Sequence, residues 1–334
     1  MNSTEIVNGT RMRAAVARRF GGPEVVGVEV VRKPAPKRDE VLIRVHASTV
    51  SIADHRTRIR DLPKGLGIYG PIALGVFRPR KPVLGMDAAG VVESVGADVT
   101  RLAPGDEVIA MLGARFGGHA EYVCVSEQKA VTRKPANLSM EDAVTLVFGG
   151  HTALAFLNRA GVGEGDEVLV NGASGAVGTA VVQLAKLRGA VVTGVCSGAN
   201  AELVRSLGAD RVIDYHVDDF TAEGASYDAI FDCVGNAAFA RVEKSIKPGG
   251  ALLMVVSDLA GLLGASRNSR RSGKVVTAAG VDVSADDLAT IVQLAEAGRY
   301  RAVVDRTYGL DEIVEAHRYV DTGRKRGNVV LRIR

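Results

Sequence analysis

The chain has 334 residues, of which 47% are hydrophobic and 24% are charged, and its formal net charge is +4. This length favours two domains, and the composition is typical of a globular protein. The absence of Trp and the low aromatic content of 4% disfavour a nucleic-acid stacking platform. No apolar run reaches membrane-spanning length, and residues 1–10 are polar and lack the apolar core of a signal peptide. The three cysteines are widely spaced and favour reduced thiols, so we expect a cytoplasmic protein.

The first third of the chain predicts a mostly β domain, in which Gly- and Pro-rich turns separate short strands. These strands are expected near residues 25–31, 40–46, 89–95, 107–111 and 120–125. Ser139 can then cap a helix that ends near Leu146, and the pair Gly149-Gly150 separates it from a second helix.

From Glu167 onward, strands and helices alternate along the chain. Strands are expected near residues 167–171, 190–195, 211–214, 228–232, 251–256 and 274–279, and helices begin near residues 176, 200, 236 and 284. Six strands joined by helical crossovers predict a doubly wound α/β domain with a six-stranded parallel sheet. A helix over 312–319 and a strand over 328–333 complete the chain.

The most informative motif is a glycine-rich loop between the strand at 167–171 and the helix at 176. Gly175 and Gly178 occupy the last two positions of a G-x-G-x-x-G pattern, and Ala173 stands at the first. A strand, a glycine loop and a helix in this order aim backbone N–H groups and a helix N-terminus at a pyrophosphate. The alternative is a tight turn without a ligand. We expect the dinucleotide to contact Ser174, Gly175, Ala176, Val177 and Gly178, and also Val234, which follows a later strand.

The end of the second strand of this domain bears on the choice of cofactor. NAD-specific folds usually place an acid about twenty residues beyond the glycine loop, on the ribose 2′-hydroxyl. This strand instead leads into Ser197, with no acid in its terminal segment to repel a 2′-phosphate. NADP is therefore favoured over NAD, with Ser197 and Tyr215 as possible phosphate contacts. Alternatively, Ser197 only starts the next helix, and Tyr215 covers the edge of the adenine pocket.

The histidines and cysteines do not form a recognisable metal site. The histidines stand at 46, 55, 119, 151, 216 and 317, without an H-x₃-H spacing or a nearby Cys in a ligand motif. A structural zinc would require clustered cysteines, and a catalytic zinc would require three ligands around an open position. The sequence therefore predicts no bound metal.

Several segments together resemble the medium-chain dehydrogenase/reductase superfamily, in its zinc-independent quinone-oxidoreductase-like branch. Besides the glycine loop, the resemblance rests on residues 83–92, 104–108, 207–215 and 327–331, and it covers nearly the whole chain. It implies a GroES-like catalytic β domain, residues 1–134 and 283–334, interrupted by a Rossmann domain, residues 135–282. It also implies an active site in the cleft between them.

Compared with that superfamily, the chain lacks the residues that hold zinc. Ser51 stands near the position of a Cys in the zinc alcohol dehydrogenases, and Met86 stands where they have a His. The Asn-Pro-x-Asp pattern of the quinone-reductase branch reads Ser51-Ile52-Ala53-Asp54 here, so only the Asp matches.

The resemblance also implies further cofactor contacts. It places Thr152 beside the nicotinamide, although this hydroxyl could also serve the start of a helix. It brings Ser51 and Asn328 to the cofactor, and Asn328 replaces the usual Lys. Ala199 stands where NADP-preferring members often have Lys or Arg.

Hydride transfer without a metal depends on positioning, which suits acceptors whose oxyanion is stabilised by conjugation. We therefore expect an NAD(P)H-dependent oxidoreductase that reduces quinones or α,β-unsaturated carbonyls. The alternatives are a carbonyl reductase or alcohol dehydrogenase, and a nucleotide-binding protein without turnover. Tyr69, His55 or solvent could supply the proton, so no catalytic residue is assigned.

We expect a homodimer that acts on a small molecule, without a nucleic-acid or membrane partner. Two basic clusters, residues 56–60 and 267–274, are interpreted as solvated loops. They could alternatively bind a substrate anion, or RNA through phosphate contacts alone.

Overall fold

The computed structural model describes residues 10–62, 65, 67, 74–222, 224, 226–278 and 284–334. The chain divides into two compact units, of which unit 1 comprises residues 1–62, 69–148 and 283–334, and unit 2 comprises residues 63–68 and 149–282. Helix α4 (Met140–Ala160) contributes residues to both units. The domain limits expected from the sequence, after residues 134 and 282, stay a prediction.

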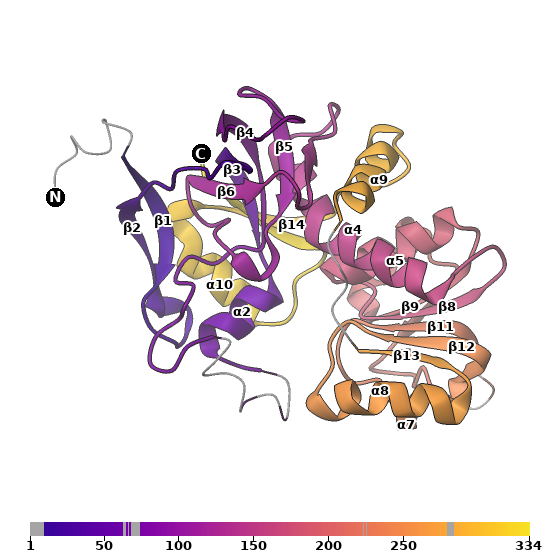
Figure 1. The fold of residues 1–334 in the computed structure, drawn as a ribbon. Helices are drawn as coiled ribbons and strands as arrows, with labels where there is room; N and C mark the ends of the chain where they lie inside the picture. Colours follow the sequence, from indigo (N-terminus) through magenta and orange to yellow (C-terminus); the bar gives the residue numbers. More distant parts are fainter. Residues whose placement is uncertain are drawn as a thin grey trace. The chain divides into compact units, whose positions relative to one another are not determined.

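Unit 1 is built on a two-stranded and a seven-stranded sheet (Figure 1). The antiparallel pair consists of β1 (Arg11–Ala17) and β2 (Val26–Arg32). The larger sheet has the order β14-β15-β3-β4-β5-β7, with β6 paired to β3. Its strands are β3 (Glu40–Val50), β4 (Asp87–Val95), β5 (Glu107–Met111), β6 (Tyr122–Ser126), β7 (Val131–Arg133), β14 (Val304–Gly309) and β15 (Asn328–Arg332).

The predicted strands of the first third are present, with one substantial extension. Strand β3 runs on to Val50 because residues 47–50 pair with β15, a partner that is almost three hundred residues away in the sequence. Short 3-10 turns lie at Pro23–Val25, Gly113–Arg115 and Leu310–Glu312. Strands β1, β7 and β14 were not among the strands expected from the sequence.

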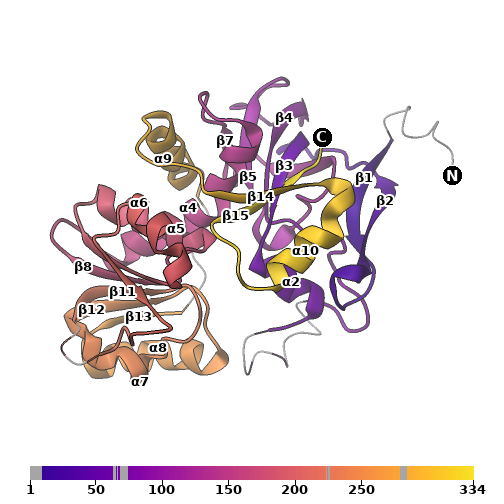
Figure 2. The same cartoon turned by 180° about the vertical axis from the view of Figure 1, so that it is seen from behind.

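Among the described residues, three helices belong wholly to unit 1: α2 (Ile52–Ile59), α9 (Ala285–Glu296) and α10 (Ile313–Asp321). Helices α2 and α10 lie side by side in both views (Figures 1 and 2). The interpretation of residues 56–60 as a solvated loop was wrong, because residues 56–59 form the second half of α2. A capping box between Ser51 and Asp54 starts this helix.

Unit 2 contains the predicted six-stranded parallel sheet, in the order β10-β9-β8-β11-β12-β13. Its strands are β8 (Glu167–Asn171), β9 (Val191–Cys196), β10 (Arg211–Asp214), β11 (Tyr227–Asp232), β12 (Ile246–Met254) and β13 (Val275–Thr277). This order reverses between β8 and β11, and it is the doubly wound arrangement whose ligands bind at the carboxyl ends of the strands. The predicted α/β class and the parallel sheet are confirmed.

The helices of unit 2 lie on both faces of this sheet, with α5 on one side and α7 and α8 on the other (Figure 1). They are α5 (Ala176–Leu187), α6 (Ala201–Ser206), α7 (Phe239–Val242) and α8 (Leu259–Ser272), with 3-10 turns at Gly198–Asn200 and Glu243–Ser245.

The second basic cluster was also wrongly interpreted as a loop, because residues 267–272 form the end of α8. Asp258 caps the start of this helix by accepting the Gly261 N–H, and Gly273 ends it in the left-handed conformation. These are ordinary helix-boundary signals, and they could have located α8 from the sequence.

Helix α4 corrects the expectation of a break at Gly149-Gly150, because it continues through both residues. A Cβ atom at Gly149 would lie 2.5 Å from the carbonyl oxygen of Ala176, the first residue of α5. Gly149 is therefore a site of close packing, and tertiary contacts offset the low helix propensity of glycine. None of the helices in the described part of the chain combines the length and apolar character of a membrane span.

Candidate functional site

The glycine loop of unit 2 joins the carboxyl end of β8 to the start of α5. Gly172 turns the chain with a φ of +82°, and Gly175 is the N-cap of α5 in an extended conformation. No side chain caps this helix. Since the first N–H groups of a helix have no partner within it, those at Ala176, Val177 and Gly178 can bind an anion.

Two glycines of this loop differ in how much free space surrounds their Cα atoms. A Cβ atom at Gly178 would lie 2.1 Å from the Gly172 carbonyl oxygen, so this glycine lets the helix pack closely on the loop. A Cβ atom at Gly175 would meet only that same oxygen, at 3.5 Å. The space above Gly175 is therefore open, as a loop that receives a pyrophosphate requires, and these residues fit a dinucleotide.

Two further predicted contacts of unit 2, Val234 and Ser174, lie at this loop, and a third, Thr152, belongs to the neighbouring helix α4. Thr152 stands one helical turn after Gly149, on the face of α4 that packs against Ala176. The side chain of Val234 lies against Gly172, because a Cβ atom there would be 2.8 Å from a Val234 methyl group. The Ser174 hydroxyl accepts a hydrogen bond from the Asn200 amide, at 3.1 Å.

The loop after β11 is held by a buried carboxylate that sequence reasoning missed. Asp232 is 1% exposed, and its Oδ1 atom accepts N–H groups from Val234 and Gly235 and from the Asn171 amide. Its Oδ2 atom accepts the Ala237 N–H. Asp232 thereby fixes the loop after β11 beside the end of β8. It reaches Asn171 because the two residues are partners in the parallel register of β11 and β8.

The end of β9 carries Ser197, and the structure corrects the expectation that no acid is near it. Strand β10 lies beside β9 and ends at Asp214. A Cβ atom at Gly198 would be 2.5 Å from the Asp214 Oδ2 atom, so this carboxylate lies directly beside the Ser197-Gly198 turn. The acid comes from the neighbouring strand β10 and not from the terminal segment of β9, which is why the segment around Ser197 gives no sign of it.

Asp214 is ionised at neutral pH. The backbone N–H of His216 donates to its Oδ1 atom at 3.0 Å and lowers the pKa of the carboxyl below its ordinary value, and the His216 ring and the Gly198 N–H act in the same direction. The exposed ring of Tyr215 lies 4.3 Å from the ring of His216. Ser197, Tyr215, His216 and Asp214 therefore form one polar corner at the carboxyl ends of β9 and β10.

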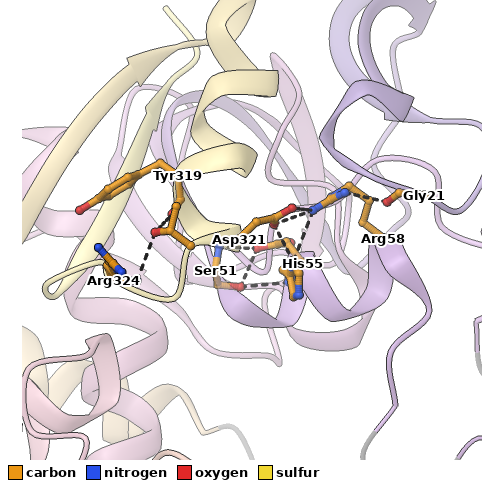
Figure 3. Close-up of polar contacts among 9 residues, drawn as sticks. Gly21, Ser51, His55, Arg58, Tyr319, Asp321 and Arg324 are labelled. Carbon is orange, nitrogen blue, oxygen red and sulfur yellow. Dashed lines mark hydrogen bonds and ion pairs between the residues drawn. The ribbon is translucent and has the colours of Figure 1, made fainter. Parts of the chain in front are cut away.

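In unit 1, Ser51 lies at the N-terminus of α2 (Figure 3). Its side chain and its backbone N–H are both engaged with Asp54. The Ser51 hydroxyl donates to Asp54 Oδ2 at 2.6 Å, and the Ser51 N–H donates to the same oxygen at 2.8 Å. The other carboxylate oxygen accepts the Gly85 N–H. Asp54 is completely buried and fixes the Ser51 side chain.

Helix α2 is tied to α10 through Arg58, whose side chain is also completely buried (Figure 3). Its guanidinium donates to both carboxylate oxygens of Asp321, at 2.6 Å each, and to the Gly21 carbonyl. His55, a candidate proton donor, has its Nδ1 atom 2.6 Å from Asp321. Arg58 is thus a structural cation and not a solvated one. The other candidate donor, Tyr69, lies outside the described residues.

The remaining predicted contact, Asn328, begins β15 in the interior of unit 1. Its side-chain amide donates to the carbonyls of Val303 and Thr145, at 3.2 and 3.4 Å. Ser51 and Asn328 both belong to unit 1, whereas the glycine loop belongs to unit 2. Their contact with a cofactor stays a prediction.

Asp87, at the start of β4, is a buried acid whose carboxylate is bound by Ser48 and Thr49. It accepts the Thr49 N–H at 2.7 Å, the Thr49 hydroxyl at 2.6 Å and the Ser48 hydroxyl at 3.2 Å. Burial nevertheless raises the pKa of Asp87 from 3.8 to about 7, and the Asp54 carboxylate acts in the same direction.

We predict that this carboxyl makes the chain less stable as the pH rises. Because the pKa of folded Asp87 lies above its unfolded value, the folded state holds a proton that the unfolded state has lost. The free energy of unfolding should therefore fall between pH 3.8 and about 7, by at most roughly 4 kcal/mol. Urea unfolding at several pH values measures this loss. Asp87→Asn should remove that component of the pH dependence, and parallel profiles of the two proteins would contradict the prediction.

No group of three or more His, Cys, Asp or Glu that could hold a metal occurs among the described residues. Met86 packs at the edge of a hydrophobic cluster of unit 1. Cys124, Cys196 and Cys233 are free thiols, and burial raises the pKa of Cys124 to about 11.

Comparison with protein families gives two matches within this chain. Residues 37–136 match the alcohol dehydrogenase GroES-like domain, and residues 207–331 match the zinc-binding dehydrogenase family. The chain is 33% identical to 2-methylene-furan-3-one reductase from Solanum lycopersicum, over 98% of this chain and 81% of the relative. It is 32% identical to the chloroplastic NADPH-dependent alkenal/one oxidoreductase from Arabidopsis thaliana, over 96% of this chain and 79% of the relative.

The fold is also similar to that of a solved quinone oxidoreductase from Coxiella burnetii. The TM-score is 0.84 at 28% identity, and the match covers 97% of this chain and all of the other. The GroES-like match lies in unit 1 apart from residues 63–68, and unit 2 contains the doubly wound sheet with its glycine loop. The chain therefore belongs to the medium-chain dehydrogenase/reductase superfamily, in its quinone-oxidoreductase-like branch.

Proposed function

We propose that this protein is a zinc-independent, NADPH-preferring reductase of quinones or α,β-unsaturated carbonyls. A nicotinamide cofactor follows from membership of the superfamily. The observation that supports the site most directly is the open space above Gly175, beside helix N–H groups that no side chain caps. The names of the similar proteins, which act on furanones, alkenals and quinones, support the substrate class.

The bound cofactor would supply a hydride to the acceptor. The residues of the chain would orient it: the first turn of α5 would hold the pyrophosphate, and Thr152, on the neighbouring helix α4, is proposed to contact the nicotinamide. Solvent can provide the proton that completes reduction of a quinone or an enone, and no buried acid is then required for that step.

A modest preference for NADPH is proposed from Ser197 and Tyr215, whose hydroxyl groups can donate to a 2′-phosphate. Asp214 opposes it, because an ionised carboxylate beside the Ser197-Gly198 turn repels that phosphate. The balance of these groups sets how large the preference is.

Zinc independence gives a prediction about the purified protein. Ser51 and Met86 are poor zinc ligands, and the Ser51 hydroxyl is already engaged with Asp54. Elemental analysis should therefore find less than stoichiometric zinc, and prolonged dialysis against a chelator should leave turnover unchanged. One tightly held zinc per chain, lost together with activity, would show that the assignment is wrong.

A screen of NADPH oxidation tests the substrate class. The acceptors are quinones, enones, aldehydes and saturated ketones, and Gly175→Val serves as the control for adventitious reduction. We expect turnover with the first two classes. Turnover confined to aldehydes and ketones would indicate a carbonyl reductase or alcohol dehydrogenase instead. Tight cofactor binding without oxidation by any acceptor would indicate a nucleotide-binding protein without turnover.

We also propose that the enzyme is a cytoplasmic homodimer. The free thiols support a reducing compartment. Sedimentation of the purified chain tests the oligomeric state, and fractionation of the source cells tests the location.

A further inference from the structure

Residues 74–82, here called the Phe77 loop, form a closed loop in unit 1. The Arg80 N–H donates to the Leu74 carbonyl at 2.8 Å, which brings the two sides of the loop together. Gly75 has a φ of +115°, and a Cβ atom on it would lie 2.1 Å from the Arg78 carbonyl oxygen. The turn is therefore tight and depends on that glycine.

The base of the Phe77 loop is fixed to strand β1. The Ala17 N–H donates to the Pro82 carbonyl at 2.7 Å, and Val16 forms a β-bridge with Val83. On the other side, the Arg60 guanidinium donates to the Val76 carbonyl at 2.9 Å. The loop is thus anchored on both sides.

The tip of the loop carries two exposed apolar side chains. Phe77 is 92% exposed, which is the largest exposed fraction of any large apolar side chain in the described part of the chain. Its neighbour Val76 is 52% exposed. An exposed aromatic side chain on an anchored loop is typical of a binding surface, so we infer a binding role for Phe77.

The same loop is strongly basic. Arg78, Arg80 and Lys81 are exposed, and residues 74–82 contain no acid. Across the described residues, none of these three side chains forms an ion pair. Arg60 adds a fourth cation at the loop, with the exposed Asp61 as its neighbour in the sequence.

We propose that the Phe77 loop docks reversibly on an anionic lipid bilayer, which revises the expectation from the sequence that the chain has no membrane partner. Phe77 and Val76 would enter the headgroup region, while Arg78, Arg80 and Lys81 would face the lipid phosphates. The apolar side chains match the acyl-chain boundary of such a bilayer, and the basic side chains match its anionic headgroups. A nucleic acid fits less well, because the loop offers a single aromatic ring and the chain has no Trp. This inference does not depend on the proposed substrate.

The first experiment measures sedimentation of the full-length protein with vesicles. We expect binding to phosphatidylcholine vesicles that contain phosphatidylserine, weaker binding to pure phosphatidylcholine, and release at high salt. Phe77→Ser should weaken binding roughly tenfold, because it removes the apolar contact. Each of Arg78→Ser and Lys81→Ser should weaken it about fivefold. Circular dichroism checks that each variant is folded.

The second experiment uses the absence of Trp from the chain. Phe77→Trp introduces a single fluorophore, whose emission should shift to the blue and be quenched by brominated lipid tails when anionic vesicles are added. Val217→Trp is the matched control, because Val217 is also highly exposed, at 78%, but is followed by two acids, Asp218 and Asp219. Its emission should not change.

Several results would overturn the proposal. These are undiminished vesicle binding by Phe77→Ser, equal binding to the two kinds of vesicle, and the absence of binding to either. Equal quenching of the two Trp variants would show that contact with lipid does not occur through this loop. Displacement of the protein from vesicles by single-stranded RNA at matched ionic strength, with unchanged Phe77→Trp emission, would assign the cations to nucleic acid. None of these outcomes bears on turnover, so they are separable from a failure of the proposed function.

Discussion

Gly175→Val is expected to abolish cofactor binding and to leave the fold intact. Gly175 has a φ of −83°, which any residue adopts, and a Cβ atom there meets only one oxygen, at 3.5 Å. The added methyl groups would instead occupy the space through which a pyrophosphate approaches the N–H groups of α5. Loss of two hydrogen bonds to a charged group, worth about 1.5–3 kcal/mol each, weakens binding by roughly a hundredfold or more.

Calorimetric titration of the folded variant with NADPH measures this effect. Gly163→Val is a matched control, because Gly163 lies in the turn before β8 and a Cβ atom on it meets no atom within 4 Å. Gly178→Val should behave differently from both. Its Cβ atom would lie 2.1 Å from the Gly172 carbonyl oxygen, so this variant should lose stability. Undiminished affinity of Gly175→Val for NADPH would mean that the loop does not hold the phosphates.

Ser197→Asp is expected to reverse the preference from NADPH to NADH. A carboxylate at this position repels a 2′-phosphate and accepts a hydrogen bond from a ribose 2′-hydroxyl. A hydrogen bond from Ser197 to a charged phosphate is worth about 1.5–3 kcal/mol, so the ratio of kcat/KM values should change tenfold or more. If the wild type favours NADH, or if the substitution leaves the ratio unchanged, Ser197 is not the discriminating contact.

Asp214→Asn should move the same ratio in the opposite direction. It removes the negative charge beside Gly198 and keeps an oxygen that can accept the His216 N–H. We expect the preference for NADPH to increase several-fold, with a dissociation constant for NADPH that falls and one for NADH that changes little. Fluorescence titrations with the two cofactors measure this without turnover. A ratio that stays constant would show that the Asp214 carboxylate is too far from the 2′-phosphate to act on it.

The class of the fold and the position of the glycine loop follow from local patterns in the sequence. Both are local: short apolar runs of strand length between turn residues mark the strands of unit 2, and Gly175 and Gly178 lie where the strand β8 gives way to the helix α5. Periodicity and turn residues act over a few positions, so they can be read without the partners of each element. The start of α2 and the whole of α8 carried equally local capping signals, at Ser51 and Asp258, and were overlooked.

Which side chains meet depends on contacts that form when distant segments of the chain pack together. Asp214 reaches the Ser197-Gly198 turn because β9 and β10 lie side by side in a parallel sheet, whose carboxyl ends share one edge. Arg58 is a buried structural cation because its partner, Asp321, comes from α10 at the far end of the chain. Gly149-Gly150 continues a helix because the first residue of α5 packs on it. These contacts join residues far apart in the sequence, so no local pattern predicts them. In the folded chain, strand register and close packing determine which of these residues meet.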